Sequence, residues 1–110
     1  MPSYLRNEVV LVRYPFSDLT AIKVRPAVIV GLLDRSPDYL IVPLTSKTSQ
    51  LAPGEFALSD WRGAGLNLPS AVKRGVYTVH SSLILKSVGH LSASDASQIE
   101  LSLRRWFELP

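Results

Sequence analysis

The apolar residues of this chain come in short runs that are rich in β-branched side chains. Pro26–Leu33 is almost wholly apolar, and Glu8–Tyr14 and Tyr39–Thr45 are of similar length and rich in Val, Ile and Tyr. Runs of this length and composition are typical of β-strands, and an unbroken apolar run indicates a central strand. None approaches the ~20 residues with which a helix spans a bilayer. The chain is therefore expected to fold around a β-sheet.

Three shorter segments are expected to add strands to this sheet. Glu55–Leu58 alternates polar and apolar residues, and Ser70–Lys73 and Val76–Val79 lie on either side of Gly75. Pro43 falls inside the third long run, and because proline has no N–H to donate, a bulge or a sheet edge is expected there. The sequence thus predicts about five or six short strands.

The last part of the chain changes to a helical period. Ser92 is a suitable N-cap, and Asp95 follows in the first turn. Apolar residues then recur at helical spacing and predict one buried stripe: Ala96, Ile99, Leu103, Trp106 and Phe107. Glu100/Arg104 and Arg104/Glu108 are spaced as i,i+4 ion pairs. The expected architecture is mainly β (α+β), an antiparallel barrel with a C-terminal helix.

Composition limits the classes of function. At 110 residues a single domain, 1–110, is expected. The absence of cysteine excludes disulfide scaffolds, thiolate zinc sites and cysteine nucleophiles, and only two histidines argue against a histidine-rich metal site. Because the first residues lack the apolar run of a signal peptide, a soluble cytoplasmic protein is expected. A net charge of +3 indicates weakly a polyanionic partner, and only 19% charged residues favours a covered face such as a homodimer interface.

Two polar positions at the ends of predicted strands stand out. The sequence has no phosphate-binding glycine loop, paired-histidine metal motif or G-x-S-x-G motif. Arg25 directly precedes the apolar run at Pro26, and Thr45 ends the next strand, followed by Ser46 and Lys47. If these strands are neighbours, a guanidinium and a hydroxyl meet at one strand end, where they suit a phosphodiester. Taken alone, Arg25 is better explained as an ordinary surface charge or a structural ion pair.

The chain resembles the MazF/PemK family of toxin endoribonucleases over nearly its whole length. No single motif is decisive, but the matching segments occur in the family's order. They are Glu8–Leu19, Lys23–Val30, Val42–Ser46, Gly65–Leu66 with Pro69–Lys73, and Gly89–Ser92 before the last helix.

The resemblance implies an SH3-like barrel that forms a homodimer and cleaves single-stranded RNA, such as mRNA, at short sequence motifs without metal or cofactor. It implies a cognate antitoxin whose flexible, acidic tail covers the RNA site. By motif, the family's catalytic arginine falls on Arg25, its catalytic threonine on Thr45, and a basic residue on Lys73. In the implied reaction the RNA 2′-hydroxyl attacks the adjacent phosphorus and leaves 2′,3′-cyclic phosphate and 5′-hydroxyl ends. Arg25 would stabilise the negative charge that develops, since arginine stays protonated in proteins.

The sequence also departs from the family. An aspartate that often follows the basic residue, and that is proposed as a general base in some members, is absent here, where Gly75 stands. Asn7 and Glu8 replace a common Gly-Asp pair. The residue that accepts the proton of the 2′-hydroxyl therefore stays unassigned. RNA contacts are expected from Phe16, as a stacking ring, and from Ser46, Lys47, Lys73 and Arg74.

Two further functions are compatible with the same fold. One is a non-enzymatic gyrase inhibitor similar to CcdB, and the other is a catalytically silent module that binds RNA or an antitoxin. The pairing of Arg25 with Thr45 favours the ribonuclease, because a gyrase inhibitor does not need it. The missing aspartate keeps the silent module open.

Overall fold

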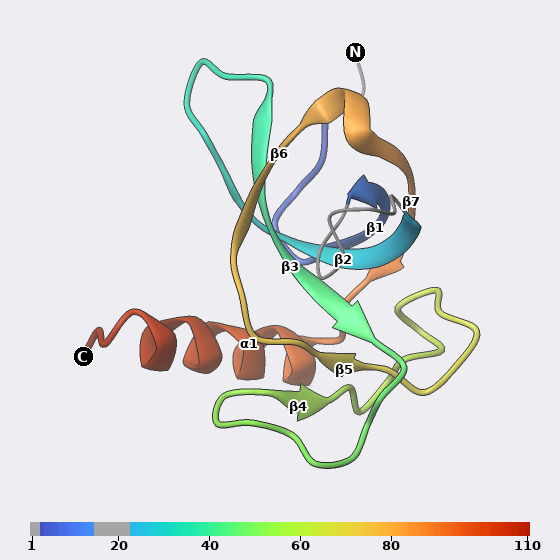
Figure 1. Cartoon of the computed structure of the whole chain (residues 1–110), viewed down its shortest axis with the longest axis vertical. Coiled ribbons are helices and arrows are strands. Elements are labelled where there is room, and N and C mark those ends of the chain that lie inside the picture. The colour runs from blue at the N-terminus through green and yellow to red at the C-terminus, as the bar shows by residue number, and fades with distance from the viewer. Residues whose placement is uncertain (1–2, 15–22) are drawn as a thin grey trace.

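The computed structural model describes residues 3–14 and 23–110, which form a curled antiparallel sheet and a C-terminal helix (Figure 1). The expected mainly β architecture with a terminal helix is confirmed. The elements in chain order are β1 (Glu8–Tyr14), β2 (Lys23–Leu32), β3 (Asp38–Thr45), β4 (Phe56–Ala57), β5 (Ala71–Val72), β6 (Tyr77–His80), the 3-10 helix η1 (Ser81–Leu83), β7 (Ile84–His90) and α1 (Ala93–Trp106).

The strands pair in the order β4-β5-β3-β2-β1-β7, and β6 also pairs with β3. β6 covers the first half of one β3 edge, at Asp38–Ile41, and β5 covers its end, at Leu44 and Thr45. In the described part of the chain no pairing joins β4 to β7. The sheet is therefore open, and barrel is a loose description of it.

Pro43 lies where β3 changes partner from β6 to β5. Its carbonyl oxygen accepts a hydrogen bond from the Lys73 backbone N–H at 2.9 Å. The nitrogen and the carbonyl of one strand residue point toward the same neighbouring strand, so the proline nitrogen also points to the β5 and β6 side of β3 and away from β2. The missing donor consequently costs no ladder bond with β2. The expected irregularity is thus a change of partner, while the register shift between β2 and β3 lies farther along, between Ile29 and Gly31.

Both faces of the central strands are buried, which explains the unbroken apolar runs. One cluster contains Val10, Ala27 and Ile41, and the opposite cluster contains Val9 and Val28 together with side chains of α1. Each of these residues in the strands is fully buried. Because β1, β2 and β3 supply side chains to both clusters, they form a rigid base for the residues at their ends.

The helix packs its apolar stripe against the second cluster. Ser92 is the N-cap, and its side chain accepts the Asp95 backbone N–H at 3.1 Å, as expected. Ile99 is fully buried, and Ala96, Leu103 and Trp106 pack partly buried against the same cluster. The expectation for Phe107 is wrong: it is the C-cap residue and is 57% exposed, because the helix ends before it can turn inward.

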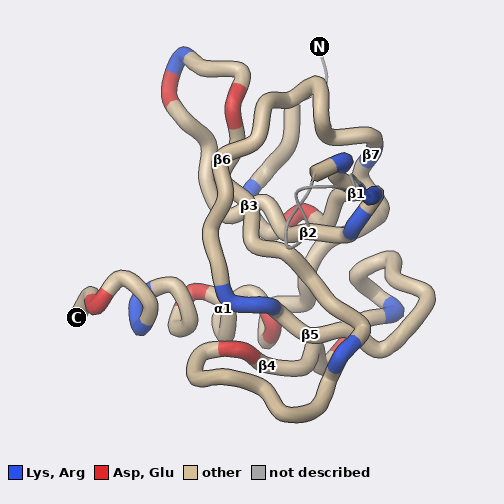
Figure 2. The backbone as a smooth tube through the Cα atoms, in the orientation of Figure 1, with Lys and Arg blue, Asp and Glu red and all other residues tan. Residues whose placement is uncertain are grey.

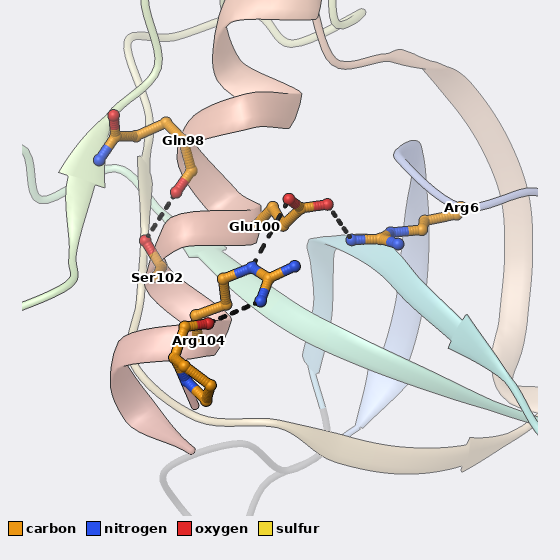
Figure 3. A network of polar contacts seen from close by, with 6 residues as sticks. Arg6, Gln98, Glu100, Ser102 and Arg104 are labelled. Atoms are coloured by element: carbon orange, nitrogen blue, oxygen red, sulfur yellow. Dashed lines mark hydrogen bonds and ion pairs between the residues drawn. The ribbon is translucent and has the colours of Figure 1, made fainter. Parts of the chain in front are cut away.

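A surface network joins α1 to the segment before β1 (Figure 3). Glu100 pairs with Arg6 at 3.4 Å and with Arg104 at 3.7 Å, so the first expected i,i+4 pair is confirmed. The second is wrong, since Arg104 donates to the Pro110 carbonyl at 2.8 Å and Glu108 lies beyond the helix with a φ of 55°. All three paired side chains are about half exposed, so the network contributes little stability.

The other strands differ from their expected bounds by at most one residue at either end, and β2 and β7 differ more. β2 begins at Lys23, three residues before Pro26, because β1 extends to Tyr14 and offers Lys23 a partner. Strand β7 was not predicted, since Lys86 and Ser87 interrupt its apolar pattern. No helix in the described residues is long and apolar enough to cross a membrane.

Candidate functional site

A pocket of about 670 Å³ opens where β2 begins and β3 ends. These two strand ends lie on the right-hand side of the molecule in Figure 1. Its floor and walls come from β1, β2, β3, β7 and the loop between β4 and β5. Apolar side chains form much of the wall. Among the described residues, the polar side chains that line it are Arg25, Thr45, Ser46, Asn67, Ser70, Lys86 and Ser87.

The register of β2 and β3 brings Arg25 and Thr45 to this pocket. Ala27 pairs with Pro43, and the same antiparallel register continued by two residues sets Arg25 opposite Thr45. Alternation along each strand then places both residues on the same face of the sheet. Arg25 is exposed and Thr45 half-buried, and both line the pocket. Both residues therefore line one pocket, and their shared role there stays a prediction.

The chain turns directly after Thr45. Its Oγ1 accepts the Lys47 backbone N–H at 3.2 Å, which is a hydroxyl-stabilised turn at the end of β3. This bond fixes the side chain at the pocket edge while leaving its hydroxyl hydrogen able to donate. Ser46 also lines the pocket, whereas Lys47 is exposed outside the lining.

The charged side chains of the described lining are both cationic. They are Arg25 from β2 and Lys86 from β7, and no aspartate, glutamate or histidine is among the described lining residues. Neither cation forms an ion pair within the part of the chain that the structure describes. Figure 2 shows Lys and Arg positions of β1, β2 and β7 near one another. The pocket thus suits an anion and lacks a described general base.

Sequence reasoning missed Lys86 because it missed β7. The pairing of β7 with β1 sets Lys86 opposite Leu11, another pocket residue. The signal in the sequence is a lone lysine within a segment of otherwise uncharged residues, Leu83–Gly89. This segment is recognisable as an edge strand only once the strand it pairs with is known.

Two glycines attach the pocket loop to β7. Gly65 has a φ of 86°, which side-chain-bearing residues rarely adopt, and a Cβ there would overlap the Val88 carbonyl. A Cβ on Gly89 would likewise overlap the Ala64 carbonyl. The two backbones therefore touch directly, and the loop that follows, with Leu66 and Asn67, is held as a pocket wall.

A buried carboxylate fixes the start of the same loop. Asp95, in the first turn of α1, is only 3% exposed. Its oxygens accept the Ser59 N–H at 2.9 Å, the Ser59 hydroxyl at 3.0 Å and the Asp60 N–H at 3.1 Å. The helix N-terminus also favours a negative charge there. Through these bonds α1 holds the segment that leads into the pocket wall.

Lys73 and Arg74 lie away from this pocket. They follow β5, and both are close enough to Glu55, which precedes β4, for their charges to act on its carboxylate. Glu55 accepts the Arg74 N–H at 2.8 Å and the Ala52 N–H at 2.7 Å. Burial raises the pKa of Glu55, but these hydrogen bonds and the charges of Arg74 and Lys73 outweigh it, so the pKa lies below its usual value. Arg74 lines a separate apolar hollow with Trp106 and Phe107.

Gly75 adopts a φ of 134°, a region that favours glycine. A Cβ there would also approach the Tyr77 ring at 3.0 Å. An aspartate at this position would be strained, so its absence is consistent with the local backbone. Phe16, the expected stacking ring, lies outside the described residues.

Neither histidine lines the pocket. His80 accepts the Ser82 N–H at 3.0 Å and caps the 3-10 helix, and His90 is exposed at the end of β7. Within the described residues, no group of three or more His, Cys, Asp or Glu side chains is arranged to hold a metal ion.

The chain is similar in sequence to one family of known proteins. Residues 5–107 match the family described as PemK-like, MazF-like toxin of type II toxin-antitoxin system. A search of curated proteins returned no match.

Solved structures share the fold. The Mycobacterium tuberculosis toxin MazF-mt6 superposes with a TM-score of 0.75 at 21% identity, covering 94% of this chain and 98% of that one. An endoribonuclease in complex with its cognate antitoxin, from a mycobacterial species, gives 0.74 at 19% identity and covers 100% and 98%. A further mycobacterial endoribonuclease gives 0.74 at 22% identity and covers 100% and 96%.

Proposed function

We propose that this chain, which belongs to the PemK-like, MazF-like toxins of type II toxin-antitoxin systems, is an endoribonuclease toxin. Its substrate is single-stranded RNA, and it cuts without a metal or cofactor at a short sequence motif. One observation carries the proposal: Arg25 and Thr45 line one pocket whose described charged residues are cationic.

The proposed reaction is a transesterification within the RNA. The 2′-hydroxyl oxygen attacks the adjacent phosphorus, the bond to the 5′-oxygen breaks, and 2′,3′-cyclic phosphate and 5′-hydroxyl ends result. The hydroxyl proton leaves to solvent, and the departing 5′-oxygen takes a proton from water. DNA is refused because it lacks the 2′-hydroxyl.

Arg25 and Thr45 act on the phosphate. The guanidinium donates to two phosphate oxygens and stabilises the charge that accumulates on them in the transition state. Thr45 donates its hydroxyl hydrogen to the same phosphate, because its oxygen already accepts the Lys47 N–H. Since the described lining has no carboxylate or imidazole, electrostatic stabilisation supplies most of the rate enhancement.

The RNA continues beyond the pocket. Ser46 contacts the phosphate neighbouring Thr45. Phe16 stacks on a base. Flanking nucleotides outside the pocket are contacted by Lys47, Lys73 and Arg74. Consistent with this, Lys73 donates its backbone N–H to Pro43, two residues before Thr45. The toxin acts in the cytoplasm.

The partners we propose are a second copy of the chain and an acidic antitoxin. Large apolar side chains are exposed on the described surface, among them Leu32 at 53% and Phe107 at 57%, and a homodimer interface would cover side chains of this kind. A neighbour in the same fold binds its cognate antitoxin, and an acidic tail would be attracted by the cations of the pocket. Light scattering after size exclusion tests the dimer.

The experiment is cleavage of a mixed-sequence RNA in EDTA by the wild type, Arg25→Ala and the matched control Arg35→Ala. Arg35 is exposed in the turn between β2 and β3, at the far end of both strands from the pocket. The proposal predicts 5′-hydroxyl ends from the wild type and the control, and a loss of about 10³-fold in Arg25→Ala. RNA binding without cleavage would support a silent module, and gyrase inhibition without cleavage would support the CcdB-like function.

A further inference from the structure

Lys86 lies on the same cross-strand row as two apolar pocket residues. Leu11 of β1 pairs with Pro26 of β2 on one side and with Lys86 of β7 on the other. Directly paired residues point to the same face, and all three line the pocket. Lys86 is exposed and has no ion-pair partner among the described residues.

A β-bulge turns Lys86 to the face of the sheet that Leu11 and Pro26 share. Val12 pairs with Ile84 but Leu11 pairs with Lys86, so Leu85 is one extra residue in β7. Ile84 is buried in the core, and regular alternation would point Lys86, two residues later, to that same buried face. The bulge instead leaves Leu85 49% exposed and reverses the alternation. Bulges that re-aim a side chain occur next to functional sites.

The two cations of the described pocket lining come from strands on opposite sides of β1 and from adjacent cross-strand rows, since Arg25 pairs with Val12 and Lys86 with Leu11. Adjacent rows point to opposite faces of a sheet, so the two side chains line the pocket from different faces. Neighbouring strands lie about 4.8 Å apart, so the backbones at Arg25 and Lys86 are separated by about 10 Å. A stacked nucleic acid strand carries one phosphate per ~3.4 Å. The separation therefore corresponds to a few nucleotides rather than to one phosphate.

We propose that Lys86 binds a second backbone phosphate of the RNA, a few nucleotides from the linkage that Arg25 and Thr45 hold. This inference rests on the proposed function. A phosphate contact fixes the register of the strand but reads no base. Lys86 thus adds affinity and positions the substrate without setting the cut motif.

The test measures binding to a mixed-sequence 2′-fluoro oligonucleotide, which has no 2′-hydroxyl to attack. For single strands each phosphate contact contributes about 0.7 to the slope of log K against log salt. Lys86→Gln should lower the magnitude of the slope by about 0.7. The affinity should fall about fourfold at 0.15 M salt and about eightfold at 0.05 M.

Two further variants separate contact from general charge. Arg35→Gln removes the same unit of charge far from the pocket and should leave the slope unchanged, because charges beyond ~8 Å are screened at 0.15 M salt. Lys86→Arg keeps the charge and should restore the slope. An unchanged slope in Lys86→Gln, or equal losses in Lys86→Gln and Arg35→Gln, overturns the inference.

A cleavage assay on ordinary RNA distinguishes the two proposals. If the wild type cleaves RNA and Lys86→Gln keeps the wild-type slope, only the role of Lys86 is wrong. If the wild type neither binds the oligonucleotide nor cleaves RNA, the proposed function is wrong and this inference fails with it. The same motif cut more slowly by Lys86→Gln supports a contact that positions but does not read.

Discussion

Replacing Asp95 by alanine should destabilise the protein more than any exposed charge change. The carboxylate is 3% exposed and accepts three hydrogen bonds, two from backbone N–H groups and one from the Ser59 hydroxyl. In Asp95→Ala these donors lose a charged acceptor, and the first turn of α1 loses a favourable negative charge.

The expected cost is about 3–4 kcal/mol. A hydrogen bond to a charged group contributes about 1.5–3 kcal/mol, and the low end applies because Ser59 and Asp60 are exposed, so water can replace part of the loss. With an unfolding entropy of about 2.1 cal/mol/K per residue, this cost lowers Tm by about 13–17 °C. Asp95→Asn keeps one acceptor and should lose about half as much.

Urea unfolding followed by circular dichroism, with a thermal melt, measures the effect. Glu100→Ala is the matched control, since it removes an acid of the same helix whose Arg6 and Arg104 partners are about half exposed. It should cost less than about 1 kcal/mol. An Asp95→Ala loss below about 1 kcal/mol, or one equal to that of the control, would refute the reasoning.

Three further predictions concern the pocket and its supports. Glu55→Gln should lower the free energy of unfolding by about 1–2 kcal/mol near pH 7. Because folding lowers the pKa of Glu55, the stability difference from the wild type should be complete above the ordinary glutamate pKa of about 4.3 and should vanish as the pH falls through the pKa of the folded protein. Urea titrations from pH 7 to 3 would detect this change. Gly65→Ala should cost at least about 2 kcal/mol in an unfolding titration and should reduce cleavage. The control Gly31→Ala should cost less than about 1 kcal/mol, because its Cβ would meet only the flexible Leu40 side chain at 3.2 Å. Equal costs would contradict the contact between the Gly65 and Val88 backbones. Thr45→Val should reduce cleavage about 10²-fold at nearly unchanged stability. The control Thr78→Val, at an exposed position of β6, should cleave as the wild type does, and equal rates of the two variants would remove Thr45 from the mechanism.

Local patterns sufficed for the elements whose signals are local. The β-branched runs predicted β1 with its bounds and placed β2 and β3 within a few residues. Ser92 and the helical stripe predicted α1. Phe107 shows the limit: periodicity placed it on the stripe, but whether the helix includes it depends on where the last turn ends.

The site was only partly accessible from sequence. Arg25 and Thr45 could be brought together because both sit at ends of strong strands whose pairing was a simple hypothesis. Lys86 could not, since its direction depends on an extra residue in β7 that only the pairing with Val12 and Leu11 reveals. Lys73 and Arg74 were grouped with the site by sequence, but the structure places them beside Glu55.

The most direct test of the central claim is an RNA with a single 2′-deoxy nucleotide at a mapped cut, incubated in EDTA with the wild type. The account predicts that cleavage at this linkage stops while other linkages with the same motif are still cut, leaving 2′,3′-cyclic phosphate and 5′-hydroxyl ends. Cleavage at the deoxy position, or 5′-phosphate ends elsewhere, would contradict it.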